Sequence, residues 1–134
     1  MDVHRIHLRG PWECRVPWNS PESISVKMPG DAAAQLPGVG GRVRFERQFQ
    51  FPAQLSETEW VDLVFDGVGS SGTVELNGEI LGTLTPADSP QRFAVTFKLK
   101  KSNRLAVEVE LAGYGETTTA PTGLYAPVAL EIRA

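Results

Sequence analysis

Apolar and polar residues alternate most clearly along residues 42–51. Val43, Phe45, Phe49 and Phe51 fall on one side of an extended chain, and the residues between them are mostly charged or amide-bearing. Successive side chains of a strand point to opposite faces of its sheet, so this segment has one face for a core and one for water. The pattern predicts a long antiparallel strand that is solvated on one side.

The same period of two recurs along the chain. It is clear in residues 61–65, 74–77, 92–99, 105–111 and 128–133, and shorter runs occupy 3–8, 12–16, 24–28 and 80–84. Turn-forming residues separate the runs, and Asn77-Gly78 is the strongest short-range hairpin signal among them. We therefore expect about eight to ten short strands and almost no helix, which is typical of an antiparallel β-sandwich or barrel.

Arg47 interrupts the apolar row of residues 42–51. A guanidinium in such a row is costly unless it is paired and hydrogen-bonded. We predict a structural ion pair between Arg47 and a carboxylate on a neighbouring strand, with Asp66 or Glu131 as the partner. The alternative is that Arg47 grips a ligand.

Length and composition fit one domain spanning residues 1–134, because 41% of the residues are hydrophobic and 22% are charged. The net charge of −3 lacks the basic excess of a nucleic-acid-binding surface. No segment approaches the roughly 20 apolar residues of a membrane span, and residues 1–7 contain no apolar stretch of signal-peptide length. These features predict a cytoplasmic protein that binds neither nucleic acid nor membrane.

The chemistry-bearing residues do not form a recognisable catalytic set. One cysteine, Cys14, and two histidines give no zinc-site spacing and no disulfide within the chain. We expect Cys14 to be buried and structural. The glycine-rich segments 38–41 and 67–72 lack the spacing of a phosphate-binding loop or a nucleophile elbow. Sixteen acidic residues could supply a carboxylate pair for glycoside hydrolysis, but the pattern singles out no pair. We therefore predict no catalytic residue.

Three residues are candidates for ligand contacts: Trp18, Arg92 and Tyr125. Trp18 lies in a proline-rich stretch, Arg92 at a predicted loop-to-strand junction, and Tyr125 just after the Gly-, Thr- and Pro-rich segment 112–122. Exposed aromatic faces bind the C–H surface of a sugar ring, and a guanidinium can meet its hydroxyls. The alternatives are that the aromatic residues cap the ends of the core and that Arg92 is an outward strand charge. Trp60, which precedes an apolar run, is interpreted as packing.

Five segments keep the order and spacing of motifs from a known family. They are an aromatic-x-Arg-x-Phe strand in 44–52, an apolar-x-Phe-acid-Gly-Val strand at 63–68, an Asn-Gly hairpin at 73–82, an Asn-x-Leu-Ala-Val-x-Val strand at 103–109 and a closing Gly-x-aromatic segment at 123–128. Together they resemble the sugar-binding domain of family 2 glycoside hydrolases, the family of β-galactosidases and β-glucuronidases.

The resemblance implies an all-β, galactose-binding-like jelly-roll β-sandwich. In that family the catalytic acids lie in a separate barrel, so the resemblance assigns no catalytic residue to this chain. Domains of this type often hold a structural calcium ion, which the sequence does not place. The leading hypothesis is a non-catalytic carbohydrate-binding-type domain whose partner is a glycan or glycoside. The alternatives are a protein-interaction or assembly module that self-associates without binding sugar, and an accessory domain of a separate glycosidase.

Overall fold

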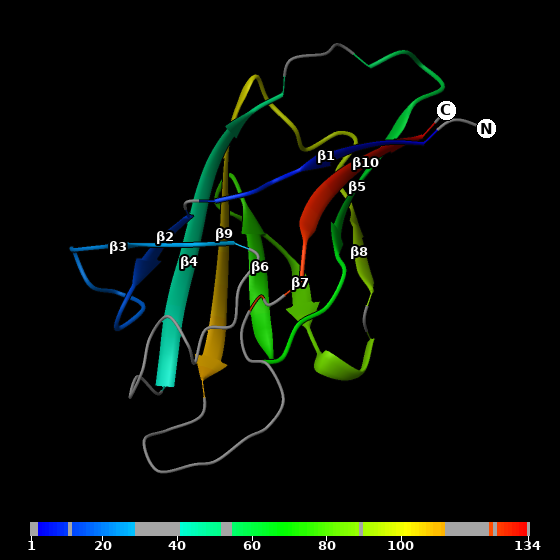
Figure 1. Ribbon diagram of the computed structural model, residues 1–134. Coiled ribbons are helices and arrows are strands. Elements are labelled where there is room, and N and C mark those ends of the chain that lie inside the picture. The colour runs from blue at the N-terminus through cyan, green and yellow to red at the C-terminus, as the bar shows by residue number, and fades with distance from the viewer. Residues whose placement is uncertain are drawn as a thin grey trace.

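The computed structural model describes residues 3–10, 12–28, 41–51, 55–88, 90–111, 124 and 126–133. Its strands form two antiparallel sheets that are the two layers of a sandwich (Figure 1). The antiparallel β-sandwich predicted from the alternation is therefore confirmed. Helical structure in the described ranges is limited to the short 3-10 turn η1 (Pro86–Asp88). Within these ranges no helix has the length and apolar character that crossing a membrane requires.

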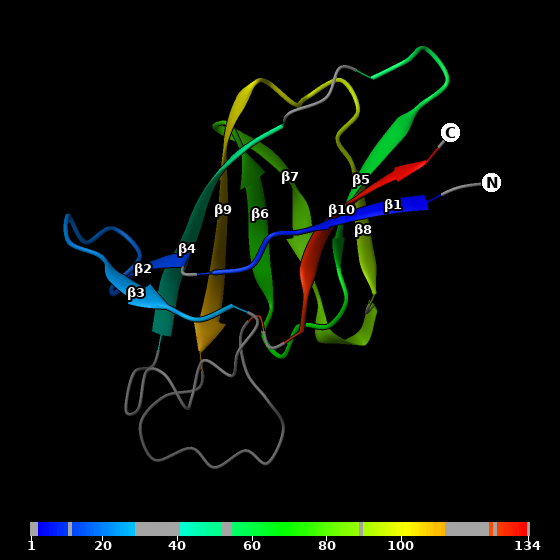
Figure 2. The same cartoon turned by 45° about the horizontal axis from the view of Figure 1, so that its top comes forward.

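One layer is a four-stranded sheet in the order β1-β10-β5-β8. Its strands are β1 (Val3–His7), β10 (Val128–Arg133), β5 (Trp60–Phe65) and β8 (Gln91–Ala94). The first and last strands are neighbours, with Val3 opposite Arg133, and Figure 2 shows β1 and β10 side by side. Arg133 is in turn opposite Trp60, so the start of β5 lies next to the end of β10. The start of β1 lies on the other side of β10.

The other layer is a six-stranded sheet in the order β3-β2-β4-β9-β6-β7. Its strands are β3 (Ile24–Val26), β2 (Trp12–Arg15), β4 (Gly41–Gln50), β9 (Ser102–Leu111), β6 (Gly72–Leu76) and β7 (Glu79–Leu84). The long strands β4 and β9 pair along their whole length, whereas β2 pairs with β4 only over Glu13–Arg15. The last part of β4 therefore extends beyond β2.

The core fills the space between the sheets with the inward rows that the alternation predicts. In β4, Val43 and Phe45 are buried almost completely, and the side chain of Arg44 between them faces outward, where it pairs with Glu108. Trp12 is fully buried, and its indole Nε1–H donates to the carbonyl of Leu8 at 2.8 Å, so its polar atom is satisfied. Cys14 is buried beside this core, as expected.

The Asn77-Gly78 turn joins β6 to β7, which confirms the predicted hairpin. The backbone φ angles are 52° at Asn77 and 85° at Gly78. Two consecutive left-handed residues are what a type I′ turn requires, and the twist of that turn matches the twist of the paired strands. Asparagine and glycine are the two residues that adopt this conformation at least cost.

The strand predicted at residues 92–99 is wrong beyond Ala94. The chain turns after that residue, with the N–H of Lys98 donating to the carbonyl of Val95 at 2.9 Å. The Thr96 hydroxyl also accepts a hydrogen bond from the N–H of Val61 at 3.0 Å. This side-chain-to-backbone contact replaces a rung of the ladder, and it turns Phe97 out to 90% exposure.

Candidate functional site

Three arginines surround one buried carboxylate on the outer face of the six-stranded sheet. Glu46 in β4 is only 6% exposed. Arg15 in β2 donates from Nε to its Oε1 at 2.5 Å, and Arg104 in β9 donates from Nε to its Oε2 at 2.9 Å. Arg44, on the same face of β4, lies 3.8 Å from that carboxylate. The neighbouring strands thus neutralise a charge that would be costly to bury alone.

These arginines decide the ionisation of Glu46. Burial by itself would raise the pKa of this carboxyl, but the hydrogen bond from Arg15 and the charges of Arg104, Arg15 and Arg44 hold the pKa below its ordinary value. A carboxyl group that stays ionised in this way has no proton to give at neutral pH. Glu46 is therefore unsuited to act as a general acid.

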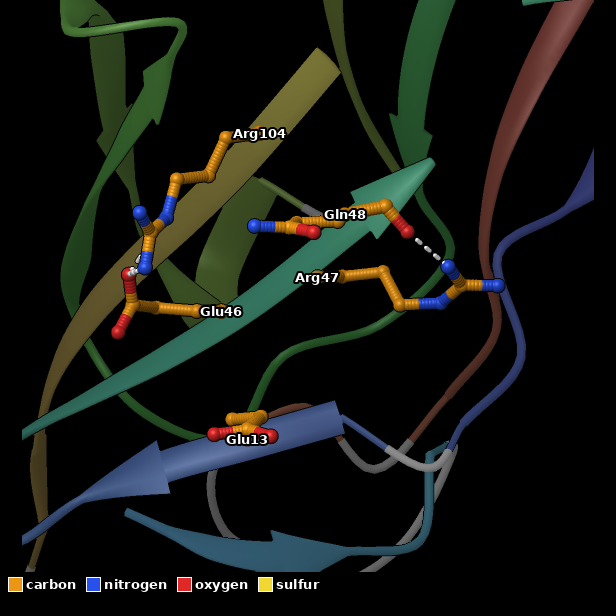
Figure 3. A pocket seen from close by; sticks show the side chains of 5 residues that line it. All are labelled: Glu13, Glu46, Arg47, Gln48 and Arg104. Carbon is orange, nitrogen blue, oxygen red and sulfur yellow. Dashed lines mark hydrogen bonds and ion pairs between the residues drawn. The ribbon is translucent and has the colours of Figure 1, made fainter. Parts of the chain in front are cut away.

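A cavity opens where β2 separates from β4, beyond the last paired residues Glu13 and Glu46 (Figure 3). It has a volume of about 350 Å³. Its lining is formed by Glu13, Glu46, Arg47, Gln48 and Arg104. The pairing of β2 with β4 stops before β4 ends. The last residues of β4 therefore have no neighbouring strand on that side, and the hollow lies there.

A second cavity of about 530 Å³ continues the first along the ends of β4 and β9. The two cavities share Arg47, Gln48 and Arg104. The second adds Phe49, Gln50, Asn77, Ser102 and Asn103 to the lining. We call the combined hollow the polar groove. Its size lies in the range of small-molecule binding sites, about 300–1,000 Å³.

The polar groove offers hydrogen bonds rather than a strong net charge. Arg104 is neutralised by Glu46 at 2.7 Å, and Figure 3 shows the two side chains meeting at one side of Gln48. The side-chain amides of Gln48 and Gln50 have no partner among the described residues, and both residues are exposed. A primary amide donates and accepts hydrogen bonds, so this surface is suited to a ligand with many hydroxyl groups.

The described ranges contain no group of three or more His, Cys, Asp or Glu residues placed to hold a metal ion. The structural calcium ion that the family resemblance suggests is therefore still not placed.

Trp18 lies beside the start of β4, at the opposite end of that strand from the polar groove. Its backbone N–H donates to the backbone carbonyl of Arg42 at 3.1 Å, and the Arg42 guanidinium lies 4.4 Å from the centroid of the indole ring. Arg42 is held in turn by Glu108 at 2.5 Å. The ring is 38% exposed, and the cation lies over it. Trp18 is partly accessible, but it does not line the polar groove.

Arg92 lies on the outer face of the other sheet. Its guanidinium donates to Glu131 at 2.5 Å and lies 3.9 Å from Asp62. The hydrogen bond to Glu131 raises the pKa of Arg92 above its ordinary value. Because Trp18 stacks with Arg42 on the outer face of the six-stranded sheet, the structure does not bring Trp18 and Arg92 into one site. Tyr125 lies outside the described residues.

The predicted ion pair of Arg47 with Asp66 or Glu131 is wrong. Arg47 donates from Nε to the backbone carbonyl of Arg9 at 2.9 Å. The two carboxylates belong to the other sheet, where Arg5 lies 2.6 Å from Asp66 and 3.6 Å from Glu131. Arg47 faces the connection between β1 and β2, which crosses from one sheet to the other. Its partner is a backbone group, which an alternation of side chains cannot reveal.

The groove residues were not singled out by the sequence. Gln48, Gln50 and Arg104 occupy outward positions of their strands, where polar residues are expected whether or not they bind anything. Among the described residues, this part of the face differs from the rest in that β2 stops pairing with β4 at Glu13. The interpretation of Trp60 as a packing residue is also wrong, since its side chain is 57% exposed.

Comparison with known proteins gives a consistent result. The model of the family described as "Glycosyl hydrolase 2 galactose-binding domain-like" matches residues 28–123. No curated protein matches the chain in sequence. Among solved structures, the chain is similar to Bifidobacterium dentium β-glucuronidase complexed with coumarin-3-O-glucuronide, with a TM-score of 0.79 and 21% identity over 97% of this chain and 30% of that one. It is likewise similar to Ruminococcus gnavus β-glucuronidase, with a TM-score of 0.79 and 17% identity over 97% of this chain and 28% of that one.

At these identities the structural likeness concerns the fold, and it confirms a galactose-binding-like β-sandwich. The chain spans about 30% of the length of the first of these enzymes. The match covers 97% of the 134 residues and only part of that enzyme, so the catalytic barrel of these enzymes is absent from these residues.

Proposed function

Because the chain belongs to the glycosyl hydrolase 2 galactose-binding-domain-like family, we propose that it is a non-catalytic carbohydrate-binding-type domain that acts beside the catalytic part of a glycosidase. Its ligand is a glycoside, and the contact surface is the polar groove. The observation that carries this proposal is a pair of side-chain amides, Gln48 and Gln50, that have no partner among the described residues and lie in a groove with two guanidinium groups, Arg47 and Arg104.

The groups that line the groove suit a sugar ligand. Glu46 is balanced by Arg15 and Arg104, while the guanidinium of Arg47 meets only backbone carbonyls among the described residues. Hydroxyl groups can accept from a guanidinium and exchange hydrogen bonds with the two amides. The B. dentium β-glucuronidase was solved with a glucuronide, which supports glycosides as the ligand class to test first.

The state of the carboxylates supports a role without catalysis. Retaining and inverting glycosidases need one carboxyl group that carries a proton and one that does not. Glu46 has a lowered pKa, and Asp62, Glu108 and Glu131 are each held in an ion pair with an arginine. Glu46 therefore stays ionised and cannot be the acid of such a pair, and each of the other three carboxylates already has an arginine as its partner.

The test is a titration of the protein with methyl glycosides and short oligosaccharides of galactose, glucose and glucuronic acid, followed by heteronuclear NMR. We expect saturable shifts at residues 46–50 and 102–104, and at least a tenfold weaker affinity, equivalent to ~1.4 kcal/mol, in Gln48→Ala combined with Gln50→Ala. Asn19→Ala, an exposed amide outside the groove, is the matched control and should bind as the wild type does.

Two outcomes would redirect the proposal. Shifts that vanish in Trp18→Ala and persist in the double glutamine variant would place the sugar at the Trp18–Arg42 end of β4. An absence of shifts with every saccharide would argue for an assembly module that keeps the fold without binding sugar.

A further inference from the structure

Two aromatic side chains are exposed together at one end of the four-stranded sheet. Trp60, the first residue of β5, is 57% exposed, and Phe97, in the turn after β8, is 90% exposed. Their ring centroids lie 6.4 Å apart with an angle of 74° between the ring planes. The rings thus pack edge to face and form a corner that opens to solvent.

The exposure of Phe97 does not come from a loosely held loop. The turn that carries it is attached to β5 at two points: the N–H of Val95 donates to the carbonyl of Val61 at 3.0 Å, and the Thr96 hydroxyl accepts from the N–H of Val61 at the same distance. The turn also closes on itself between Lys98 and Val95. The fold therefore holds the ring of Phe97 in a fixed place in contact with water. Exposing a large apolar ring is unfavourable, and packing of the core does not require it.

A polar pair borders this corner. Arg133 of β10 is opposite Trp60 in the sheet register, and its guanidinium is paired with the carboxylate of Asp62. The two charges neutralise each other, so the rim does not select an ionic ligand. Both groups keep further hydrogen-bonding atoms, since a guanidinium has five N–H groups and a carboxylate has two acceptor oxygens.

The size of the apolar surface distinguishes between two kinds of partner. Aromatic side chains carry ~150–250 Å² each, so the exposed parts of Trp60 and Phe97 amount to about 300 Å². A stable protein–protein interface buries about 800 Å² per partner, and its centre is apolar. This area is smaller than the roughly 450 Å² of apolar surface that each partner contributes to such an interface, and it is enough to cover the C–H face of one sugar ring.

We propose that Trp60 and Phe97 form a second saccharide contact, in which one pyranose ring stacks in the aromatic corner while its hydroxyls reach Arg133 and Asp62. The inference rests on the proposed function in one respect, since both assume a saccharide ligand. The two sites are structurally separate, however, because the polar groove belongs to the six-stranded sheet and the aromatic corner to the other one. The variants of one site leave the other intact.

Affinity electrophoresis in gels containing soluble polysaccharides tests the inference, with a galactan, a β-glucan and a polygalacturonate as probes. We expect at least one of the polysaccharides to retard the wild type. Phe97→Ala and Trp60→Ala should each weaken that retardation about tenfold, and Trp60→Phe should keep most of it.

Phe97 contributes almost nothing to the core, so its replacement leaves the thermal unfolding midpoint unchanged and separates binding from folding. The matched control is Ile80→Ala, which removes a side chain that is 67% exposed on β7.

The outcomes are distinguishable. Retardation that is lost in the Gln48→Ala, Gln50→Ala variant and unchanged in Phe97→Ala would overturn the second site and leave the proposed function standing. Retardation that depends only on Phe97 and Trp60 would support this site and overturn the proposal that the polar groove binds the saccharide. If no polysaccharide retards the protein, and its mass in sedimentation rises with concentration for the wild type but not for Phe97→Ala, the corner is a self-association surface and the inference is wrong. A monomeric protein without retardation also overturns it.

Discussion

Asn77 and Asn103 are hydrogen-bonded to each other through their side chains, with Nδ2 of Asn77 donating to Oδ1 of Asn103 at 3.0 Å. Oδ1 of Asn77 accepts from the N–H of Arg104 at 2.8 Å, and Oδ1 of Asn103 accepts from the N–H of Lys100 at 2.8 Å. The asparagines of two sequence motifs, the Asn-Gly hairpin and the start of β9, thus form one contact. They fix the hairpin next to the polar groove.

Replacing Asn77 with alanine should lower the free energy of unfolding by roughly 2–3 kcal/mol. It removes the side-chain hydrogen bonds to Asn103 and Arg104 and places a residue with little tolerance for left-handed backbone at φ 52°. Asn77→Gly loses the same bonds but accepts the backbone angle, so it should be about 1 kcal/mol more stable than the alanine variant. Urea unfolding measures both values. Equal stabilities for the two variants would mean that the left-handed backbone contributes nothing to the difference.

Glu46→Gln should destabilise the protein by about 1–3 kcal/mol at pH 7, because it leaves Arg15, Arg44 and Arg104 without their shared carboxylate. The cost is moderate for a buried pair because these arginines are partly exposed. Glu110→Gln changes an exposed glutamate in β9 and serves as the matched control, with an expected effect within about 0.5 kcal/mol.

The contribution of Glu46 should also depend on pH. Its pKa is lower in the folded than in the unfolded protein, so the folded state binds the proton less readily. The stabilisation is therefore present above the unfolded pKa, about 4.3, and is lost as the pH falls through the folded pKa. The difference in unfolding free energy between wild type and Glu46→Gln should shrink as the pH is lowered from 6 toward acid. A difference that stays constant over that range would contradict the ion-pair explanation.

Those features that depend on neighbouring residues in the chain could be predicted from the sequence. The inward rows of β4, β9 and β10 follow directly from apolar alternation, and the β6–β7 hairpin follows from Asn77-Gly78. The strand at residues 92–99 failed because its alternation continues through Phe97, while the Thr96 hydroxyl bonds to β5 and ends the strand. A tertiary contact of one hydroxyl overrode a pattern of period two.

The candidate site was less predictable, because it is made of outward residues and of a difference in strand length. Gln48 and Arg104 are typical of a solvated sheet face, and the hollow beside them exists because β2 stops pairing at Glu13. The predicted partner of Arg47 was wrong for a related reason. Alternation assigns Arg47 to the core side, but it says nothing of the backbone carbonyl of Arg9 that crosses there.

Gly72→Ala should be strongly destabilising, with a loss of roughly 2–4 kcal/mol or of the folded protein altogether. A Cβ atom at this position would lie 2.2 Å from the carbonyl oxygen of Glu108 and 2.8 Å from Cγ1 of Val109. β9 is held by β4 on its other side, so its backbone cannot move away without loss of ladder hydrogen bonds. Thermal unfolding followed by circular dichroism measures the effect. Gly41→Ala is the contrast: nothing lies within 4 Å of its added Cβ, and only its φ of 83° opposes alanine, at about 1–2 kcal/mol.

Arg47→Ala should cost about 0.5–1.5 kcal/mol, because the Arg9 carbonyl loses its donor at the crossing between the sheets and water replaces it at this exposed position. The control follows from the nature of the contact. Arg9→Ala removes an exposed side chain but keeps the backbone carbonyl, so it should be nearly neutral. Urea unfolding of the two variants distinguishes a backbone partner from a side-chain partner. A stable Arg47→Ala, or an Arg9→Ala as unstable as Arg47→Ala, would show that the bond to the Arg9 carbonyl does not hold this crossing.

Cys14 should be unreactive as long as the protein is folded. The thiol is 1% exposed, and burial raises its pKa to about 11. At pH 8 only about one thiol in a thousand is then ionised, and the thiolate is the form that attacks a disulfide reagent. Labelling with a chromogenic disulfide should therefore be slow under native conditions and complete within minutes in concentrated urea. Since Cys14 lies between β3 and β4 in the sheet, its labelling rate reports how often β2 detaches from those neighbours. Prompt stoichiometric labelling of the native protein would mean that β2 opens readily, and the polar groove beside it would then have no fixed wall.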